Sequence, residues 1–214
     1  MTDTLVLSSN KRWIVDHFVL DVLIVDESRQ IVGRPNLTIV IDEFSRCIAG
    51  FHLSLKRREG SHLISALRNA ILQKNHSHEY GTQNSWVVYG VPHELIIDNG
   101  MDSRSKVLTD FVKKLSINLL FLPPGQPSKL EKVLRQVDNE CLSLLPVSAL
   151  QSNLNAGADI SQRNCLSLQE LEKLLTCYVC DCYNQQPDSQ GSATRSQKWL
   201  SSFGEKLPKV IANC

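Results

Sequence analysis

An apolar run near the amino end, residues 12–25, limits the folds open to this chain more than any other segment. It begins RWIVDHFVLDVLIV, and its aromatic and branched residues predict a long strand, bent near residues 18–20. Asp16 lies in the middle of this run. Because burying an unpaired carboxylate is costly, a charge at this position needs a compensating partner, and a divalent metal ion is one such partner.

The segments that follow predict an α/β fold. Residues 26–36 suit a turn or hairpin connection, and short links between the first three strands predict an antiparallel meander. Right-handed crossovers would set the later strands parallel to the first, which gives a mixed sheet flanked by helices. The further strands are expected at 37–42, 47–55, 93–98 and 117–122, and the helices at 62–74 (with Ser61 as N-cap), 105–115 and 127–145.

The chain of 214 residues can hold one domain of ordinary size and a smaller appendage. We expect an N-terminal extension at 1–10, a core at 11–145, a Ser- and Asn-rich linker at 146–165 and a C-terminal helical extension at 166–214. Ser167 and Glu170 have the spacing of a capping box at the start of that extension. The tail around Trp199 and Phe203 is expected to pack only weakly on the core.

Composition excludes several classes of protein. A hydrophobic share of 42% argues against wholesale disorder, and no apolar run approaches the roughly 18–20 residues of a membrane span. The amino end lacks the pattern of a secretory signal, and an odd count of seven cysteines favours reduced thiols in the cytosol. The net charge of only +1 argues mildly against tight, autonomous DNA binding over a long surface.

Two further carboxylates lie in settings that suit metal binding. Asp98 ends the apolar run LIID, at the point where a strand meets a turn, and ligands of open sheets bind at the carboxyl ends of parallel strands. Glu131 follows 33 residues later near the start of a helix that would project it toward the sheet. Mg²⁺ prefers oxygen ligands, so Asp16, Asp98 and Glu131 predict a site for two divalent cations that acts on nucleic acid.

Each of these acids also has a simpler interpretation. Asp98 begins Asp-Asn-Gly, a common turn sequence, and Asp16 suits an edge-strand surface as well. Glu131 and Arg135 are four residues apart on a helix, the spacing of a surface ion pair. Rival acids are present, with Asp42 the strongest, although its context suits a hairpin turn; the others are Asp21, Asp26 and Asp102.

Cysteine and histidine patterns carry less information. Cys177, Cys180 and Cys182 resemble a metal-ligating cluster, but helical geometry turns Cys182 away from the other two, and we expect ordinary core or surface thiols. His17 follows Asp16, and strand alternation places it on the opposite face of the sheet, so packing is its expected role.

Four segments together resemble a known family. In chain order they are RWIVDHFVLDVLIVD, GRPNLTIVIDEFSRCIAGFHLSL, YGVPHELIIDNGMD and FLPPGQPSKLEKVLRQVD. They are similar to the catalytic core of DDE transposases and retroviral-type integrases, and among these to TnsB-like and Mu-type bacterial transposases. The resemblance covers about residues 11–200 and implies a ribonuclease-H-like fold.

The resemblance also implies a chemistry. Asp16 matches the family's first aspartate, Asp98 the second and Glu131 the glutamate, and in the family these residues hold two Mg²⁺ or Mn²⁺ ions. One ion activates the attacking water or DNA 3′-hydroxyl, and the other stabilises the departing oxygen. The reaction implied is cleavage at the element ends followed by strand transfer into target DNA.

Partners follow from the same resemblance. Lys129, Lys132 and Arg135, next to Glu131, are expected to contact DNA phosphates. The implied partners are the element ends, target DNA, further copies of the chain on DNA and accessory transposition proteins, without a membrane. The implied location is the bacterial cytoplasm, at the nucleoid when DNA is bound.

Departures from the family pattern keep two alternatives open. Ser103 stands where an aromatic residue is usual, and residues 128–130 replace a common Lys-Gly pair. One alternative is a truncated, non-catalytic remnant or assembly module that keeps the fold. The other is a ribonuclease-H-like nuclease.

Overall fold

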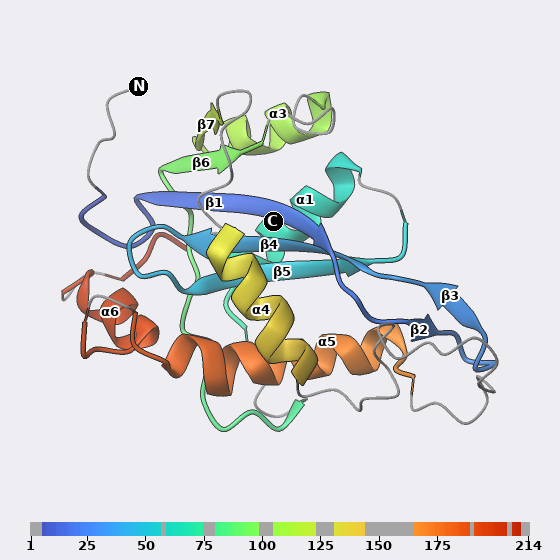
Figure 1. Ribbon diagram of the computed structural model, residues 1–214. Coiled ribbons are helices and arrows are strands. Elements are labelled where there is room, and N and C mark those ends of the chain that lie inside the picture. The colour runs from blue at the N-terminus through green and yellow to red at the C-terminus, as the bar shows by residue number, and fades with distance from the viewer. Residues whose placement is uncertain are drawn as a thin grey trace.

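The computed structural model of the protein describes residues 6–56, 59–74, 80–98, 105–122, 131–143, 165–188, 191–204 and 207–210. Its centre is a five-stranded sheet with the order β5-β4-β1-β6-β7 (Figure 1). These strands are β1 (Arg12–Val19), β4 (Asn36–Asp42), β5 (Ile48–Ser54), β6 (Glu94–Ile97) and β7 (Asn118–Phe121). The first three pair antiparallel, whereas β1–β6 and β6–β7 are parallel, so the predicted mixed sheet is confirmed.

The long apolar run at the amino end divides into two strands. After Val19 the chain leaves the main sheet, and β2 (Ile24–Val25) pairs with β3 (Ile31–Gly33) in a small hairpin that projects to one side (Figure 1). The bend expected near residues 18–20 is confirmed: the Leu20 N–H donates to the Pro35 carbonyl at 3.0 Å, and the Leu20 side chain is buried.

Helix α1 (Gly60–Ile71) packs closely on one face of the sheet, against β4 and β5. Gly50 in β5 permits this contact, because a Cβ at this position would lie 2.5 Å from the backbone nitrogen of Ala70. The expected cap at Ser61 is wrong. The helix begins at Gly60, two residues earlier than expected, and its N-cap is Glu59, to whose side chain the Ser61 hydroxyl donates at 3.3 Å.

The remaining helices complete two layers around the sheet. Helix α3 (Lys106–Lys114) lies beside α1 and is capped by Ser105, while α4 (Glu131–Ser143) crosses in front of the sheet in Figure 1, above α5 (Leu168–Cys177). Strand β7 forms an outer strand with Phe121 36% exposed, because no further strand among the described residues pairs with its outer side. No helix in the described part of the chain has the length and apolar character needed to cross a membrane.

The segment after residue 165 contributes buried side chains to the hydrophobic core. Helix α5 carries the predicted capping box of Ser167 and Glu170, and it continues through a π-helical turn (Tyr178–Cys182) and a 3₁₀ turn (Tyr183–Gln185). Helix α6 (Arg195–Ser201) follows. Trp199 in α6 is 1% exposed and packs edge-on against Phe203, with ring centroids 4.7 Å apart, so the tail packs more firmly than we expected.

Asn184 joins this C-terminal segment to the edge of the sheet. Its side-chain oxygen accepts the Ile48 N–H at 2.9 Å, and its side-chain nitrogen donates to the Ile48 carbonyl at 3.1 Å. The amide thus takes the place of a neighbouring strand at β5, where Trp86 also donates to the Ile48 carbonyl at 2.9 Å. Edge strands are protected when their backbone groups are covered in this way.

Substituting Asn184→Ala should lower the free energy of unfolding by about 1–3 kcal/mol, since the buried Ile48 N–H loses its acceptor. Urea denaturation measures the change. Asn139→Ala, at an exposed position of α4, is the matched control and should have little effect. Equal stabilities of the two variants would contradict the role assigned to Asn184.

Two histidines meet between β5 and α1. The His52 and His62 rings have centroids 5.4 Å apart, and the Ser54 hydroxyl lies 3.1 Å from His62 Nε2. Burial, together with the nearby His62, lowers the pKa of His52 below its usual value. His52 therefore stays neutral in the folded protein at a pH where the unfolded chain already binds a proton.

The free energy of unfolding should decrease as the pH is lowered through this window, because the unfolded state takes up the proton first. We expect the loss of unfolding free energy between about pH 7 and about pH 5.5 to be smaller in His52→Gln than in the wild type. Urea denaturation at both values tests this, with His93→Gln at an exposed position as the control. An unchanged pH dependence in His52→Gln would count against it.

Candidate active site

Asp16 lies in β1, and Asp98 directly follows the end of the parallel strand β6. The β1–β6 register pairs Trp13 with Leu95 and Ile14 with Ile96. Asp16 and Asp98 each lie two residues beyond the Ile14–Ile96 pair, so strand alternation sets both carboxylates on the same face of the sheet. The register thus gives the two aspartates equivalent offsets from the last paired residues of the two strands.

The two strands part where these acids stand. The β1–β6 ladder ends at Ile14 and Ile96, β6 itself ends at Ile97, and β1 continues beside β4 with Asp16 opposite Ile39. Both aspartates are half-buried. Asp16 Oδ1 accepts the backbone N–H of His17 at 2.7 Å, which orients that carboxylate. Carboxyl ends of parallel strands at such a divergence are where open α/β sheets bind ligands.

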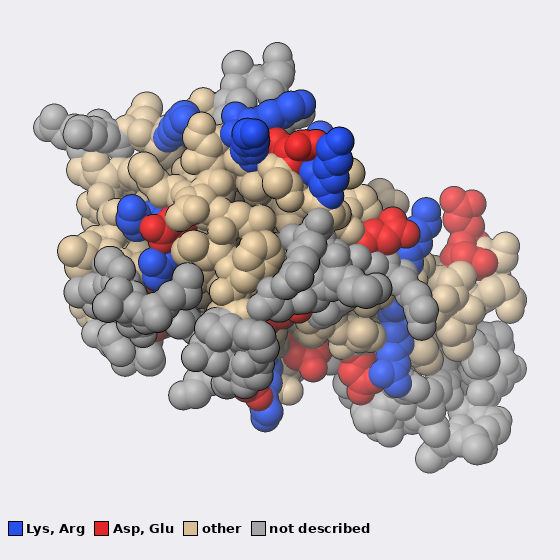
Figure 2. Space-filling model, turned by 90° about the horizontal axis from the view of Figure 1, so that it is seen from above, with Lys and Arg blue, Asp and Glu red and all other residues tan. Residues whose placement is uncertain are grey.

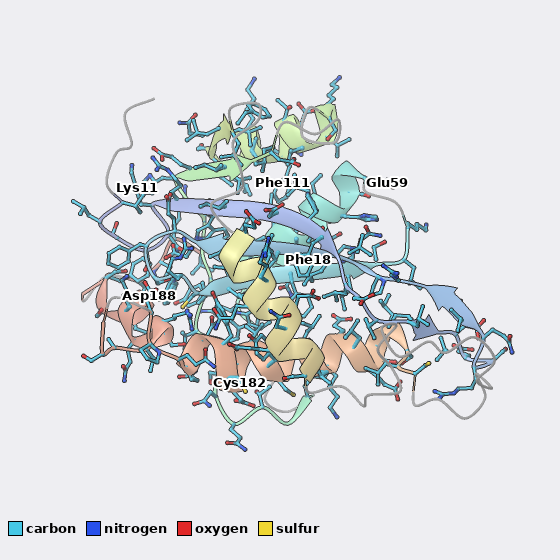
Figure 3. The ribbon with its side chains drawn as sticks, viewed as in Figure 1. Lys11, Phe18, Glu59, Phe111, Cys182 and Asp188 are labelled. Atoms are coloured by element: carbon cyan, nitrogen blue, oxygen red, sulfur yellow. The ribbon has the colours of Figure 1, made fainter. Side chains whose placement is uncertain are left out.

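Alternation along β1 turns His17 to the other face. Its Nδ1 lies 2.7 Å from the Thr38 hydroxyl on β4, and Thr38 is in turn opposite His52 on β5. His52 contacts His62 of α1, so this is the α1 face of the sheet. Phe18, labelled in Figure 3, is two residues beyond Asp16 on β1 and shares its face by the same alternation.

Glu131 is placed differently from the two aspartates. It begins the row of exposed positions on α4 that comprises Glu131, Arg135, Asn139 and Ser143. Its side chain is 53% exposed and accepts from Arg135 Nη2 at 2.7 Å. Such an exposed pair on one helix contributes only about 0.3–0.5 kcal/mol.

The three predicted ligands are not gathered into one cluster. Among the residues that the structure describes, no three His, Cys, Asp or Glu side chains lie close enough to hold one metal ion, so Glu131 does not complete a cluster with the aspartates. The physical reason is electrostatic: three carboxylates repel one another, and Arg135 offers Glu131 a cation one helical turn away.

The body of α4 is nevertheless held firmly. Val133 and Val137 are buried, and Glu140 accepts the Tyr178 hydroxyl at 2.8 Å. Gln136 donates to Glu140 at 2.9 Å and to Gln186 at 3.3 Å. These contacts tie α4 to the C-terminal segment, so the position of the helix that carries Glu131 depends on residues beyond the predicted linker.

Asp138 is an acid that the sequence pattern did not single out. One of its oxygens is buried without a hydrogen-bond partner, and burial together with the charge of Asp21 raises its pKa. A spacing of seven residues from Glu131 puts both acids on a similar side of α4. That heptad spacing is the one signal in the sequence that could have identified it.

The strongest rival acid has a structural role. Asp42 is 0% exposed, and its carboxylate accepts the Asn10 N–H at 2.7 Å, the Ser45 N–H at 2.8 Å and the Ser45 hydroxyl at 2.6 Å. Burial raises its pKa despite these bonds. The interpretation of Asp42 as a hairpin-turn residue agrees with these contacts.

The residues expected to contact DNA are only partly described. Lys129 lies outside the described residues, and the side chain of Lys132 is likewise not described. Arg135 is 76% exposed, which leaves its guanidinium accessible to a phosphate. Seen from above, basic and acidic side chains are interspersed (Figure 2), as the net charge of +1 suggests.

The three cysteines that resembled a metal-ligating cluster, Cys177, Cys180 and Cys182, lie in different surroundings. Cys180 is buried, and burial raises its pKa to about 12, so it stays a neutral thiol. Cys177 donates to the Tyr80 carbonyl at 3.6 Å. Cys182, labelled in Figure 3, is partly exposed.

Comparison with known proteins gives consistent results. Residues 14–147 match the family model described as the TnsB C-terminal domain. The transposase for transposon Tn552 of Staphylococcus aureus is 30% identical over 206 residues, which are 94% of this chain and 40% of that protein. The Tn7 transposition protein TnsB of Escherichia coli is 27% identical over 176 residues, 78% of this chain and 25% of that protein.

Solved structures agree on the fold. The HTLV-2 integrase catalytic core domain in complex with magnesium superposes with a TM-score of 0.54 at 15% identity, covering 90% of this chain and 97% of that domain. A chain of the simian T-cell lymphotropic virus intasome, solved in complex with PP2A regulatory subunit B56 gamma, gives a TM-score of 0.59 at 18% identity, covering 97% of this chain and 60% of that one.

The chain thus spans less than half the length of the transposases it matches, and the matched part contains both aspartates and Glu131. The mixed sheet with helices on both faces is the ribonuclease-H-like arrangement of integrase catalytic cores. The chain therefore belongs to the TnsB C-terminal domain family and has the fold of a transposase and integrase core.

Proposed function

We propose that this chain is the catalytic core of a transposase that cleaves the ends of a mobile element and joins them to target DNA with the help of divalent metal ions. The observation that carries the proposal is the β1–β6 register, which ends two residues before Asp16 on one strand and two residues before Asp98 on the other. Membership of the TnsB C-terminal domain family supports it independently.

The donor set suits Mg²⁺ or Mn²⁺. Asp16 and Asp98 are hard oxygen donors on one face of the sheet, and the half-buried setting of both favours a compensating cation. Glu131 has the right donor chemistry but must first leave Arg135. Two bound ions would activate the attacking hydroxyl and stabilise the departing oxygen. One structural neighbour, the HTLV-2 integrase core, was solved with magnesium.

The protein residues would hold and orient the reactants. The His17 N–H fixes the Asp16 carboxylate, and the parallel pairing of β1 with β6 sets the spacing between the two aspartates. Arg135 would bind a DNA phosphate through its planar guanidinium, which matches phosphate oxygens in a bidentate manner. Lys129 and Lys132 are the further phosphate contacts that we propose, from their positions beside Glu131 in the sequence.

The organisation of the working protein is part of the proposal. We assign the catalytic core to residues 11–145, preceded by an extension at 1–10, and the linker and helical extension to 146–165 and 166–214. The DNA partners are the element ends and the target, bound by several copies of the chain with accessory transposition proteins. The expected location is the bacterial cytoplasm, at the nucleoid.

A second function is a non-catalytic assembly module that keeps the fold. The Glu131–Arg135 pair favours it, because a core in which that pair never opens would lack its third ligand. The buried contacts of α4 and the C-terminal segment would be retained in such a module.

A strand-transfer assay with recessed donor-end DNA and a plasmid target, in Mg²⁺ or Mn²⁺, tests the catalytic function. The wild type should join DNA, whereas Asp16→Asn and Asp98→Asn should fall to background, since each removes a charge from the metal site. Asp110→Asn, at an exposed position of α3, is the matched control and should remain active. A wild type no more active than Asp98→Asn would refute catalysis and favour the assembly module.

A further inference from the structure

We propose that Arg195, with Lys198 and Arg46 beside it, forms a binding site for a phosphate group at the end of the sheet away from the two aspartates. Arg195 and Lys198 belong to α6, and Arg46 lies in the connection between β4 and β5. Helix α6 lies beside the end of the sheet where β1 begins (Figure 1), whereas Asp98 follows the carboxyl end of the parallel strand β6. The proposed site is therefore separate from the candidate active site.

Arg195 is a buried cation that forms no ion pair with the residues that the structure describes. It is only 7% exposed. Arginine side chains are almost never fully buried unless they are paired, because taking an unpaired charge out of water is costly. The burial of this guanidinium therefore favours an anion as its partner.

The protein fixes one side of the guanidinium and leaves the other side unbonded. Nη1 donates to the Tyr183 carbonyl at 2.7 Å, and Cζ lies 4.1 Å from the centroid of the Tyr183 ring. Within the described part of the chain, Nε is buried without a hydrogen-bond partner, and Nη2 also lacks a partner but keeps contact with solvent. Nε and Nη2 form one edge of the planar fork, and such an edge binds two oxygens of one anion side by side.

Two further cations lie near this edge. Lys198 is one helical turn after Arg195, and the Arg46 carbonyl accepts the Tyr183 hydroxyl at 3.2 Å. Burial raises the pKa of Tyr183 to about 12, while the charges of Arg195 and Arg46 act against that rise, so both cations lie close to this side chain. Cations grouped in this way favour a phosphate, whose several oxygens can accept from more than one of them.

The neighbouring carboxylates are bonded to other groups. Asp188, labelled in Figure 3, pairs with Lys198 at 3.5 Å, and Asp42 accepts hydrogen bonds from Asn10 and Ser45. The side chains of Asp188 and Lys198 are 21% and 32% exposed, and partly exposed pairs are weak. A phosphate can therefore bind Lys198 as well as Arg195.

The expected source of the phosphate is the DNA backbone, and this assignment rests on the proposed function. A contact at α6 would hold DNA at a place remote from the reacting strand, and backbone contacts of this kind position DNA without reading its sequence. Inorganic phosphate offers the same chemistry, and the experiment below separates the two sources.

NMR of the arginine Nε–Hε groups in ¹⁵N-labelled wild-type protein reports on the site directly. The Arg195 signal is identified by its absence from Arg195→Lys, and exposed Arg135 supplies the reference signal. Sodium phosphate should shift the Arg195 signal along a saturable curve, whereas sodium chloride at equal ionic strength should not. A signal that responds no more to phosphate than to chloride would overturn the site.

Variants test the same site by isothermal titration calorimetry with sodium phosphate. Arg195→Lys keeps a cation that can donate to the Tyr183 carbonyl but loses the planar fork, so it should bind phosphate at least about tenfold more weakly. Lys198→Met should also weaken binding, and Lys173→Met, at an exposed position of α5, should match the wild type. Thermal unfolding verifies that each variant is folded. Unchanged affinity in both Arg195→Lys and Lys198→Met would refute the assignment.

A short duplex oligonucleotide of arbitrary sequence identifies the source. If the duplex shifts the Arg195 signal and Arg195→Lys weakens duplex binding, the phosphate is that of the DNA backbone. If inorganic phosphate shifts the signal and the duplex does not, the phosphate site stands and its assignment to DNA is refuted. A wild type that binds phosphate at Arg195 but joins no DNA would count against the proposed function and not against this site.

Discussion

The parallel pairing of β1 with β6 is the contact on which the candidate site depends. It joins strands that are about eighty residues apart in the sequence, and its register sets Asp16 and Asp98 at equivalent positions. A shift of one residue would turn one aspartate to the α1 face. Buried Ile14 and Ile96, paired just before the acids, hold the strands together up to the point where they diverge.

The C-terminal segment contributes to the site indirectly. Asn184 covers the edge of β5, Tyr178 binds Glu140 of α4, and Trp199 is buried against Tyr89. Helix α4 is therefore held in place by contacts with residues beyond the predicted core at 11–145.

Glu131 illustrates the balance between local and long-range electrostatics. A carboxylate near two other carboxylates is repelled, while a guanidinium four residues along the same helix attracts it at little conformational cost. The free energy of that exposed pair is small, so a doubly charged cation or a DNA phosphate can shift the equilibrium.

Much of this protein was determined by the sequence alone. Apolar runs and turn residues predicted the order of strands and helices, the bend after β1, the Ser167 capping box and the turn at Asp42, because these depend on neighbours along the chain. Only the tertiary structure decided the start of α1 at Gly60, the exposed edge at β7, the burial of Trp199 and the direction of the Glu131 side chain. These features depend on which distant groups come into contact, and on small differences in energy that no local pattern records.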